Sequence, residues 1–416
     1  MKSFLQFLKR AYKYFRATKR VWRKPPQADL LIIDRGTASS LDEMFTHHQP
    51  HIMDIRGESV NMWALLRAVP KIYLGAVGYL EAYIDFVKPK LILSRNGDSS
   101  PNLWQLKRRV VDYKVALIQN GWRPDLYGAI NISNFEAGNK IKPEIDVAFV
   151  FGLAQADDRL KNHSNLVVGC GSTKLNGISD SDSSATPKDI VFISQYRVGQ
   201  WKDIPNFYDA EDSFCQSLAE FAKNHDLQIH VAGAYQDSER SLEEEKWFSS
   251  KFDGANWLFH RMNKETSSYH LINAADLVVT VDSTMGYEAL ALGRKVAFLT
   301  CRMLSRYPAI EPEWNELILK LAPDAADRSE VKEIPLRFGA AKLFAETGFF
   351  WSNIKSIDEF DRVLNNVYSA SPQEWERISR PIADQLMVHD YGNTKIRAYV
   401  ESVLADSLEN AKVTKI

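Results

Sequence analysis

The sequence of 416 residues has few cysteines and no long apolar run. Its three cysteines, Cys170, Cys215 and Cys301, lie far apart and form no Cys-x-x-Cys pair, which argues against a disulfide framework and predicts buried thiols in a reducing compartment. No apolar stretch is long enough to cross a bilayer, and the apolar residues near the first methionine are interrupted too often for a secretory signal. These absences predict a cytoplasmic protein and leave peripheral attachment to the inner membrane open.

The chain is also poor in metal-binding motifs and in net charge. Asp180-Ser-Asp182 has the letters of an Asp-x-Asp pair, but it falls in a stretch rich in Ser and Asp rather than at a strand end. His47, His48 and His51 lack a nearby cysteine or a His-Glu-x-x-His context, so we interpret them as a polar loop and expect no metal cofactor. A formal net charge of -1 gives no general reason to expect nucleic-acid binding.

Basic residues are concentrated at the start of the chain. Residues 1–24 contain nine lysines and arginines and no acidic residue, which leaves 43 basic against 53 acidic residues in the remainder. Two interpretations stay open for this segment: a basic amphipathic helix on the inner-membrane surface, or a helix whose aromatic residues pack on the protein's own surface. Pro25-Pro26 end the helix in either case. Its apolar face would contain Phe4, Leu8, Ala11, Phe15 and Trp22.

Short apolar segments alternate with helical patterns along most of the chain, which predicts parallel sheets. In the first half, strands are expected at residues 29–33, 90–94, 115–119 and 146–151, and a helical pattern covers 62–87. In the second half, strands are expected at 190–194, 228–232, 257–259, 277–281 and 296–300, with helices over 210–225 and 243–252. The run Glu243-Glu244-Glu245 is interpreted as a solvated helix face.

A stretch of Gly, Ser, Asp and Pro at residues 177–188 separates these two halves and is the predicted linker. We therefore predict an α/β protein with two Rossmann-like domains, one over residues 26–176 and the other over 189–370. Residues 371–416 form a final segment that is mostly helical by pattern.

The strongest functional signal is the stretch over residues 275–290. Its β-branched run Leu277 to Val281 predicts a strand buried on both faces, and Asp282, Ser283 and Thr284 are residues that cap helices. A helix that begins there would direct hydroxyls and partial positive charge toward an anion. In this interpretation Gly286 permits close backbone approach to a phosphate, and Glu288 accepts hydrogen bonds from ribose hydroxyls. The alternative is an ordinary capped helix that binds nothing.

This stretch, as Asp282-Ser-Thr-Met-Gly-Tyr-Glu288, resembles the nucleotide-binding half of GT-B glycosyltransferases of bacterial surface-carbohydrate biosynthesis. Three further segments resemble the same group: Ser94-Arg-Asn-Gly-Asp98, Ile118-Gln-Asn-Gly-Trp-Arg123 and Val191-Phe-Ile-Ser-Gln-Tyr-Arg197. The resemblance implies two Rossmann-like domains that face a cleft, with the final helices returning to the first domain. It also implies a nucleotide-sugar donor in the second domain and a glycan or glycolipid acceptor of capsule or lipopolysaccharide type in the first.

The group includes transferases that use CMP-linked ulosonic acids such as Kdo. The resemblance therefore makes CMP-Kdo or a related CMP-ulosonate the preferred donor. Two other functions stay open: a polyol-phosphate transferase with a CDP-linked donor, and a non-catalytic binding protein recruited to a membrane by residues 1–24. Polyol-phosphate enzymes of this kind usually show a histidine where this chain has Asn120, so imidazole base catalysis is not expected at that loop.

Candidate site residues follow from these segments and from polar residues at predicted strand ends. The alternative for each is a solvated surface side chain, a capping residue or a turn residue. Expected donor-binding residues are Gln195, Arg197, Arg261, Asp282, Ser283, Thr284, Gly286 and Glu288. Expected catalytic residues are Asp237, His260, Arg197 and Asp125, with Arg197 also stabilising the leaving phosphate. Expected acceptor-binding residues are Asn96, Asp98, Asn120 and Arg123.

Overall fold

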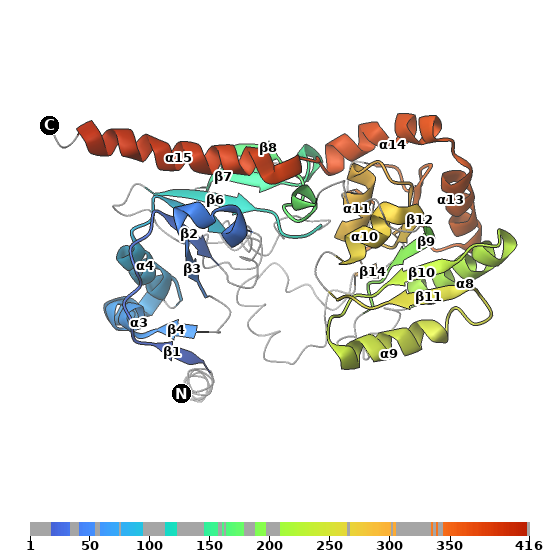
Figure 1. The fold of residues 1–416 in the computed structure, drawn as a ribbon, viewed down its shortest axis with the longest axis horizontal. Helices are drawn as coiled ribbons and strands as arrows, with labels where there is room; N and C mark the ends of the chain where they lie inside the picture. The colour runs from blue at the N-terminus through green and yellow to red at the C-terminus, as the bar shows by residue number, and fades with distance from the viewer. Residues whose placement is uncertain are drawn as a thin grey trace.

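The computed structural model describes residues 18–33, 41–54, 59–74, 76–94, 113–122, 145–156, 160–161, 164–178, 188–196, 209–263, 267–300, 303–304, 334–335, 338–339 and 344–413. They form two α/β units, each built on a six-stranded sheet (Figure 1). Both sheets are parallel throughout, so the predicted fold class is confirmed. Within the described part of the chain, no helix combines the length and apolarity that a membrane span requires.

The second sheet has the strand order of a Rossmann fold. Numbered along the chain, its strands lie in the order 3-2-1-4-5-6, and the order reverses between β9 and β12. Both of these central strands are buried and rich in Val, Ile and Leu, as the covered faces of a parallel sheet require. In spatial order the strands are β11 (Trp257–His260), β10 (Ile229–Ala232), β9 (Lys188–Ile193), β12 (Ala275–Thr280), β13 (Val296–Leu299) and β16 (Trp351–Ser352).

The first sheet contains all four strands expected from the sequence, and two strands that the sequence did not indicate, β3 and β8. In spatial order it runs β3 (His51–Met53), β2 (Leu30–Ile33), β5 (Leu91–Ser94), β6 (Lys114–Ile118), β7 (Ile145–Val150) and β8 (Ser164–Gly169). Two short ladders lie apart from the large sheets, β1 (Lys19–Val21) with β4 (Ser59–Asn61) and β14 (Met303–Leu304) with β15 (Ile334–Pro335).

The helical pattern over residues 62–87 is not one helix, which corrects the prediction. Helix α3 (Met62–Ala68) begins at Asn61, whose side chain accepts hydrogen bonds from the backbone of Trp63 and Ala64. A 3-10 segment, η2 (Val69–Leu74), follows, and α4 (Ala76–Val87) completes the region. Pro70 lies at this break, because proline has no N–H to continue the hydrogen bonding of a helix.

The histidines interpreted as a polar loop also lie in regular structure. His47 and His48 belong to the 3-10 turn η1 (Thr46–His48), and His51 begins β3. The Nε2 atom of His51 lies 2.9 Å from the Tyr83 hydroxyl, and the two rings stack. His51 is therefore a packed residue of the first unit.

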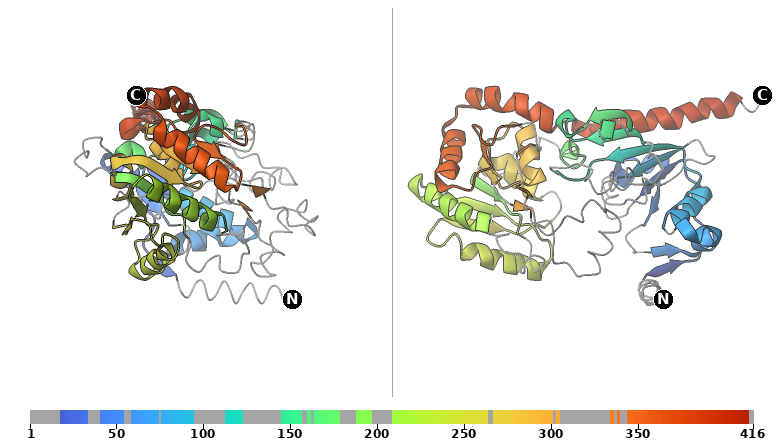
Figure 2. Two further views of the ribbon diagram at one scale, coloured as in Figure 1. Left: turned by 90° about the vertical axis from the view of Figure 1, so that its right-hand side faces the viewer. Right: turned by 180° about the vertical axis from the view of Figure 1, so that it is seen from behind.

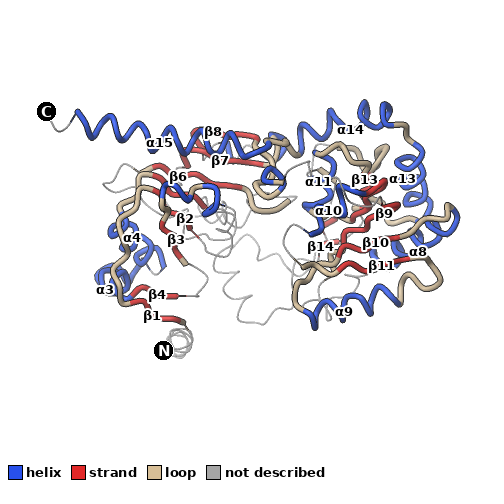
Figure 3. Tube along the Cα trace, viewed as in Figure 1, coloured by secondary structure: helices blue, strands red, loops and turns tan. Residues whose placement is uncertain are grey.

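Helices surround the second sheet and share its large core (Figure 3). Helix α9 starts five residues before its predicted beginning, because Asp237 caps it. The interpretation of residues 243–245 as a solvated face is wrong for Glu244, which is fully buried. The helices are α8 (Asp209–Asn224), α9 (Ser238–Ser249), α10 (Ser267–Ala274), α11 (Thr284–Ala291) and α13 (Ile357–Ser369).

The last two helices connect the units, and their predicted return to the first domain is confirmed. Helix α14 (Pro372–Leu386) packs on the second unit, where the Trp375 indole donates to the Gly293 carbonyl at 3.0 Å. The chain then crosses through the turn η7 (Tyr391–Asn393) into α15 (Thr394–Val413), which lies along the first sheet. Figure 2 shows from behind that α14 and α15 follow one side of both units.

The crossing segment is anchored by buried amides. Asn176, at the end of the first unit in the turn η4 (Leu175–Gly177), donates to the Cys170 carbonyl at 2.7 Å and to the Asn393 side chain at 3.1 Å. Its Oδ1 accepts the backbone N–H of Asp390 at 3.0 Å. Lys395 donates to the Gly169 carbonyl at 2.6 Å. The chain after α14 is therefore fixed to the end of β8.

Candidate functional site

The strand-order reversal of the second sheet brings two of the predicted segments together. Residues 194–196 leave the end of β9, and residues 281–283 leave the end of the adjacent β12. The Gln195 side chain accepts the backbone N–H of Asp282 at 2.9 Å, so both predicted donor-binding segments are held side by side. Such a reversal is called the switch point of the sheet. In open α/β sheets, ligands bind there, beyond the carboxyl ends of the strands.

Helix α11 begins directly after this point. Ser283 is its N-cap, and the Ser283 hydroxyl accepts the backbone N–H of Met285 at 3.3 Å. A helix N-terminus carries partial positive charge. The hydroxyls of Ser283 and Thr284 both accept a hydrogen bond here, so each O–H proton is still able to donate to an anion.

The structure gives Gly286 a packing role, and its predicted approach to a phosphate stays a prediction. A Cβ atom at this position would lie 2.4 Å from Cγ2 of Thr280 and 3.0 Å from Cε1 of Phe298. Glycine is therefore required because α11 packs closely on strands β12 and β13, as the last glycine of a Rossmann fingerprint does.

A loop of the first domain lies against the start of α11. The backbone N–H of Trp122 donates to the Thr284 hydroxyl at 2.8 Å, and the Trp122 ring stacks on Tyr287 with centroids 3.6 Å apart. Trp122 follows β6, so the carboxyl ends of strands from both sheets meet here. Tyr287 is fully buried, and burial raises the pKa of its phenol, whose oxygen accepts the backbone N–H of Gly339 at 3.1 Å.

Asn120, the predicted acceptor-binding residue in this loop, is half-buried and lies between Gln119 and Gly121. The buried Gln119 accepts the backbone N–H of Phe151 at 2.7 Å and donates to the Gly121 carbonyl at 3.0 Å. Gln155 contacts Gln119 at 3.3 Å and donates across to the carbonyl of Gly339. These bonds fix the backbone on both sides of Asn120 without using its side chain.

Glu288 lies further along α11 and is buried. Its Oε2 atom accepts the hydroxyl of Tyr269 at 2.8 Å. The expected ribose contact therefore stays a prediction, in which a ribose would compete with Tyr269 for this carboxylate.

A second buried carboxylate, Glu244, orders the neighbouring strand ends. Its two oxygens lie 3.0 and 3.1 Å from the backbone nitrogen of Ala234, which follows β10, and Oε1 also accepts the Ser194 hydroxyl, which follows β9. Charge-assisted bonds of this kind are the stronger hydrogen bonds in proteins. Glu244 thus fixes the two loops beside the switch point.

Two predicted residues have other partners in the structure. Asp237 caps α9 by accepting the backbone N–H of Arg240 at 3.0 Å. Arg261 forms an exposed ion pair with Glu245 at 3.0 Å. Both lie on the β10 and β11 side of the sheet, and the described contacts do not join them to the start of α11. Their catalytic and donor-binding roles stay predictions.

His260, at the end of the edge strand β11, contacts His230 of β10, with Nε2 and Nδ1 2.8 Å apart. Burial, together with the nearby charges of Lys188 and His260, lowers the pKa of His230 to about 4. Burial also lowers the pKa of His260, again with a contribution from Lys188. The pair is therefore neutral at pH 7, and one ring donates to the other.

This pair should make the protein less stable in mild acid. The folded His230 binds a proton less readily than the unfolded residue, so its contribution to stability is complete above about pH 6.5 and is lost as the pH falls toward about 4. We expect the free energy of unfolding, measured in urea from pH 7.5 to 4.5, to decline less in a His230→Gln variant than in the wild type. His225→Gln, a change at an exposed histidine, is the control, and equal declines in both variants would contradict the assignment.

Five predicted site residues lie outside the described residues, namely Asn96, Asp98, Arg123, Asp125 and Arg197. So do residues 1–17 of the basic segment and 179–187 of the linker. The helix predicted over residues 1–24 does not reach Pro25, because Lys19–Val21 form strand β1, which pairs with β4. Sequence reasoning also missed three residues that build the site, Trp122, Glu244 and Tyr287. Trp122 and Tyr287 stand inside segments that carried the resemblance, and that was the available signal for them.

Similar solved structures include UDP-GlcNAc 2-epimerase from Neisseria meningitidis bound to UDP-GlcNAc, at 10% identity and a TM-score of 0.49, covering 91% of this chain and 99% of that one. Anabaena HepE in complex with UDP and glucose has 12% identity and a TM-score of 0.47, covering 90% of this chain and 100% of that one. MurG from Acinetobacter baumannii has 10% identity and a TM-score of 0.47, covering 90% and 99%. Sequence identities and TM-scores this low do not bear on the activity of this chain.

No curated protein matches the sequence. A protein-family model described as "putative O-antigen biosynthesis protein" matches residues 116–316 and 325–404. The match covers more than half of the chain, from β6 of the first sheet through the second sheet and α14 into α15. On this match, the chain belongs to the O-antigen biosynthesis protein family that the description names.

Proposed function

We propose that the protein is a glycosyltransferase of surface-polysaccharide assembly that uses a nucleotide-linked sugar. The observation that carries this proposal is the contact between the start of α11, at the switch point of the second sheet, and the Gly121–Trp122 loop of the first domain. A donor at the switch point would thus lie next to residues of the other domain, where an acceptor can bind. The family match to O-antigen biosynthesis supports the same class of product.

The proposed chemistry is the departure of a nucleotide phosphate from an oxocarbenium-like sugar. Negative charge then grows on the leaving phosphate, and the hydroxyls of Ser283 and Thr284 with the α11 N-terminus would stabilise it. Arg197 follows Tyr196 beyond β9 in the sequence and is the proposed cation. Asp125, Asp237 and His260 are candidates for the nucleophile or base, and Glu288 is the candidate for ribose recognition.

Our preferred donor is CMP-Kdo or a related CMP-ulosonate, with a polysaccharide or lipopolysaccharide acceptor. This choice rests on the sequence resemblance. A CDP-linked polyol donor would instead give a phosphodiester, and the product mass separates the two. A non-catalytic binding protein would turn over neither donor.

A thermal-shift panel of CMP, CDP, UDP, GDP and their sugar conjugates tests the site. A nucleotide at about 100 times its Kd should stabilise the native state by about 2.7 kcal/mol. Ser283→Ala should weaken nucleotide binding about 10- to 100-fold, since a lost hydrogen bond to a charged group costs about 1.5–3 kcal/mol.

Ser371→Ala is the matched control. Ser371 caps α14 by accepting the backbone N–H of Glu374, so its loss should lower stability by about 1 kcal/mol, as the loss of the Ser283 cap does, without affecting nucleotide binding. Equal nucleotide affinities in the two variants, or no stabilisation of the wild type by any nucleotide of the panel, would reject the proposal.

A further inference from the structure

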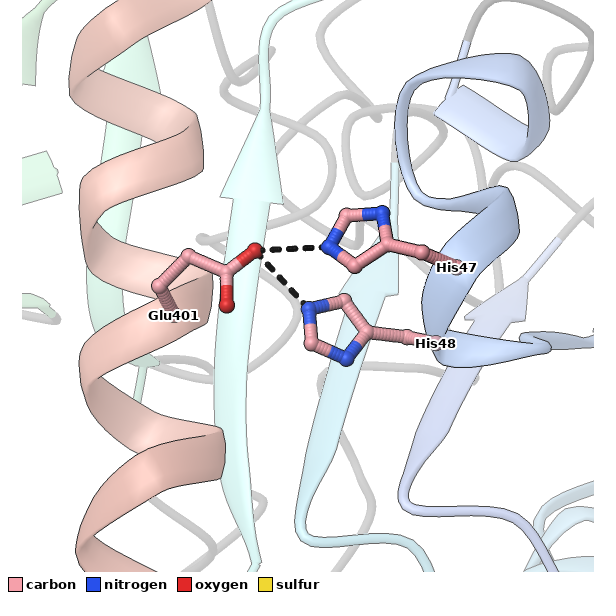
Figure 4. Close-up of side chains that lie close together, drawn as sticks. All are labelled: His47, His48 and Glu401. Carbon is pink, nitrogen blue, oxygen red and sulfur yellow. Dashed lines mark hydrogen bonds and ion pairs between the residues drawn. The ribbon is translucent and has the colours of Figure 1, made fainter.

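Three potential metal ligands converge between η1 and α15 (Figure 4). The Nε2 atoms of His47 and His48 each lie 2.9 Å from the same oxygen, Oε1 of Glu401. The two imidazole rings lie side by side, with centroids 4.0 Å apart. His48 is largely covered, with 20% of its side chain exposed, whereas His47 and Glu401 are about half exposed. The cluster is therefore covered on the His48 side and open to solvent on the other.

Packing of the first unit brings these residues together from positions 354 residues apart. Leu41 and Phe45, just before η1, are buried in one core with Ile396 and Val400 of α15. Arg397, four residues before Glu401, donates to the Met44 carbonyl at 2.9 Å. The backbone that carries the histidines is thus docked on α15 by contacts that do not involve the cluster, and the three ligands are preorganised.

We propose that His47, His48 and Glu401 form a binding site for a divalent transition metal, with Zn²⁺ as the best fit. Two neutral imidazoles and a carboxylate are ligands that zinc accepts, and the open side leaves a fourth position for water. Binding requires the Nε2 lone pairs, so each ring would hold its proton on Nδ1.

The spacing of the ligand atoms fits this ion. Zinc binds these atoms at about 2.0–2.2 Å, which places two ligands at the tetrahedral angle about 3.3 Å apart. The two Nε2 to Oε1 distances of 2.9 Å are close to this value, and all three ligand atoms lie within 4.8 Å of one another. Small rotations of exposed side chains would complete the site.

A metal here would hold α15 on the first sheet beyond the apolar contacts already present. Because α15 is the end of the segment that crosses from the second domain, the ion would also strengthen that connection. This inference does not rest on the proposed transferase activity.

Isothermal titration of the full, untagged and chelator-treated chain with ZnCl₂ tests the site. We expect one Zn²⁺ per chain, with affinity reduced more than about 100-fold in His47→Ala, His48→Ala and Glu401→Gln, since removing even a residue behind a ligand costs about 10- to 100-fold. His225→Ala, at an exposed histidine outside the cluster, should bind as the wild type does.

Hydrogen exchange provides a second measurement. Zn²⁺ should slow exchange of the α15 amides in the wild type and in His225→Ala, and should not slow it in Glu401→Gln. Absence of Zn²⁺ binding by the wild type, or binding that survives substitution of both His47 and Glu401, would overturn the proposal.

Discussion

Replacing Gly171 with alanine should lower the free energy of unfolding by about 2–5 kcal/mol. Gly171 has φ +74°, a conformation that costs a residue with a Cβ atom about 1–2 kcal/mol. A Cβ atom there would also lie 1.8 Å from the Val388 carbonyl oxygen. Overpacking typically adds about 1–3 kcal/mol, and here the obstacle is backbone. Gly171 and Val388 both donate their backbone N–H to the Phe151 carbonyl, so the substitution would push the crossing segment off the first unit.

Urea unfolding measures this loss, and limited proteolysis locates it. We expect the chain between α14 and α15 to become the first site of cleavage in the Gly171→Ala variant. Gly177→Ala is the matched control, because it lies six residues away and has no heavy atom within 4 Å of the added Cβ position. A Gly171→Ala protein as stable as the Gly177→Ala protein would show that the close contact is absent in solution.

Gly286→Ala should destabilise the protein by about 1–3 kcal/mol and also weaken nucleotide binding. The added methyl would meet Thr280 at 2.4 Å and Phe298 at 3.0 Å, so α11 must move away from the sheet. This movement would displace Ser283 and Thr284 from their positions at the switch point. The gain in helix propensity from glycine to alanine, up to about 1 kcal/mol, is included in this range.

A second substitution, at Thr280, tests whether a steric clash causes the losses expected in Gly286→Ala. Thr280→Ser removes the Cγ2 methyl and keeps the hydroxyl that accepts the backbone N–H of Ser283 at 3.2 Å. The double variant should recover at least half of the stability and of the nucleotide affinity lost in Gly286→Ala, as neighbouring residues show coupled effects. Independent, additive losses would mean that Gly286 acts in another way.

The sheets could be predicted from sequence wherever the strands are buried on both faces. Leu30 to Ile33 and Leu277 to Val279 are continuous apolar runs, and this pattern has few alternatives. Strand β8 was missed because it lies at the edge of the sheet, where burial is incomplete, and only Leu166 to Val168 of its six residues are apolar. The break after α3 was missed because the apolar spacing of a helix continues through Pro70.

The site could be predicted only in part, for a related reason. Caps such as Ser283 are signalled by a few adjacent residues, and the structure shows the cap. Contacts between distant segments have no such local signal. Glu244 occurs in a run of three glutamates that is typical of a solvated face, yet it is buried against Ser194 and Ala234. The roles of Gly286 in packing and of Glu401 beside His47 likewise became visible only in the fold.

The anchoring of the crossing segment constrains how the two domains can move. The chain passes between them twice, once after residue 178 and again before Asp390, and Asn176 bonds the second passage at the point where the first one leaves. Because the two interdomain connections are hydrogen-bonded to each other, they act as a single hinge rather than as two independent connections. Opening and closing of the domains would therefore be a rotation about a hinge beside Asn176, and the Trp122–Thr284 contact, formed by other loops, would open and close with it.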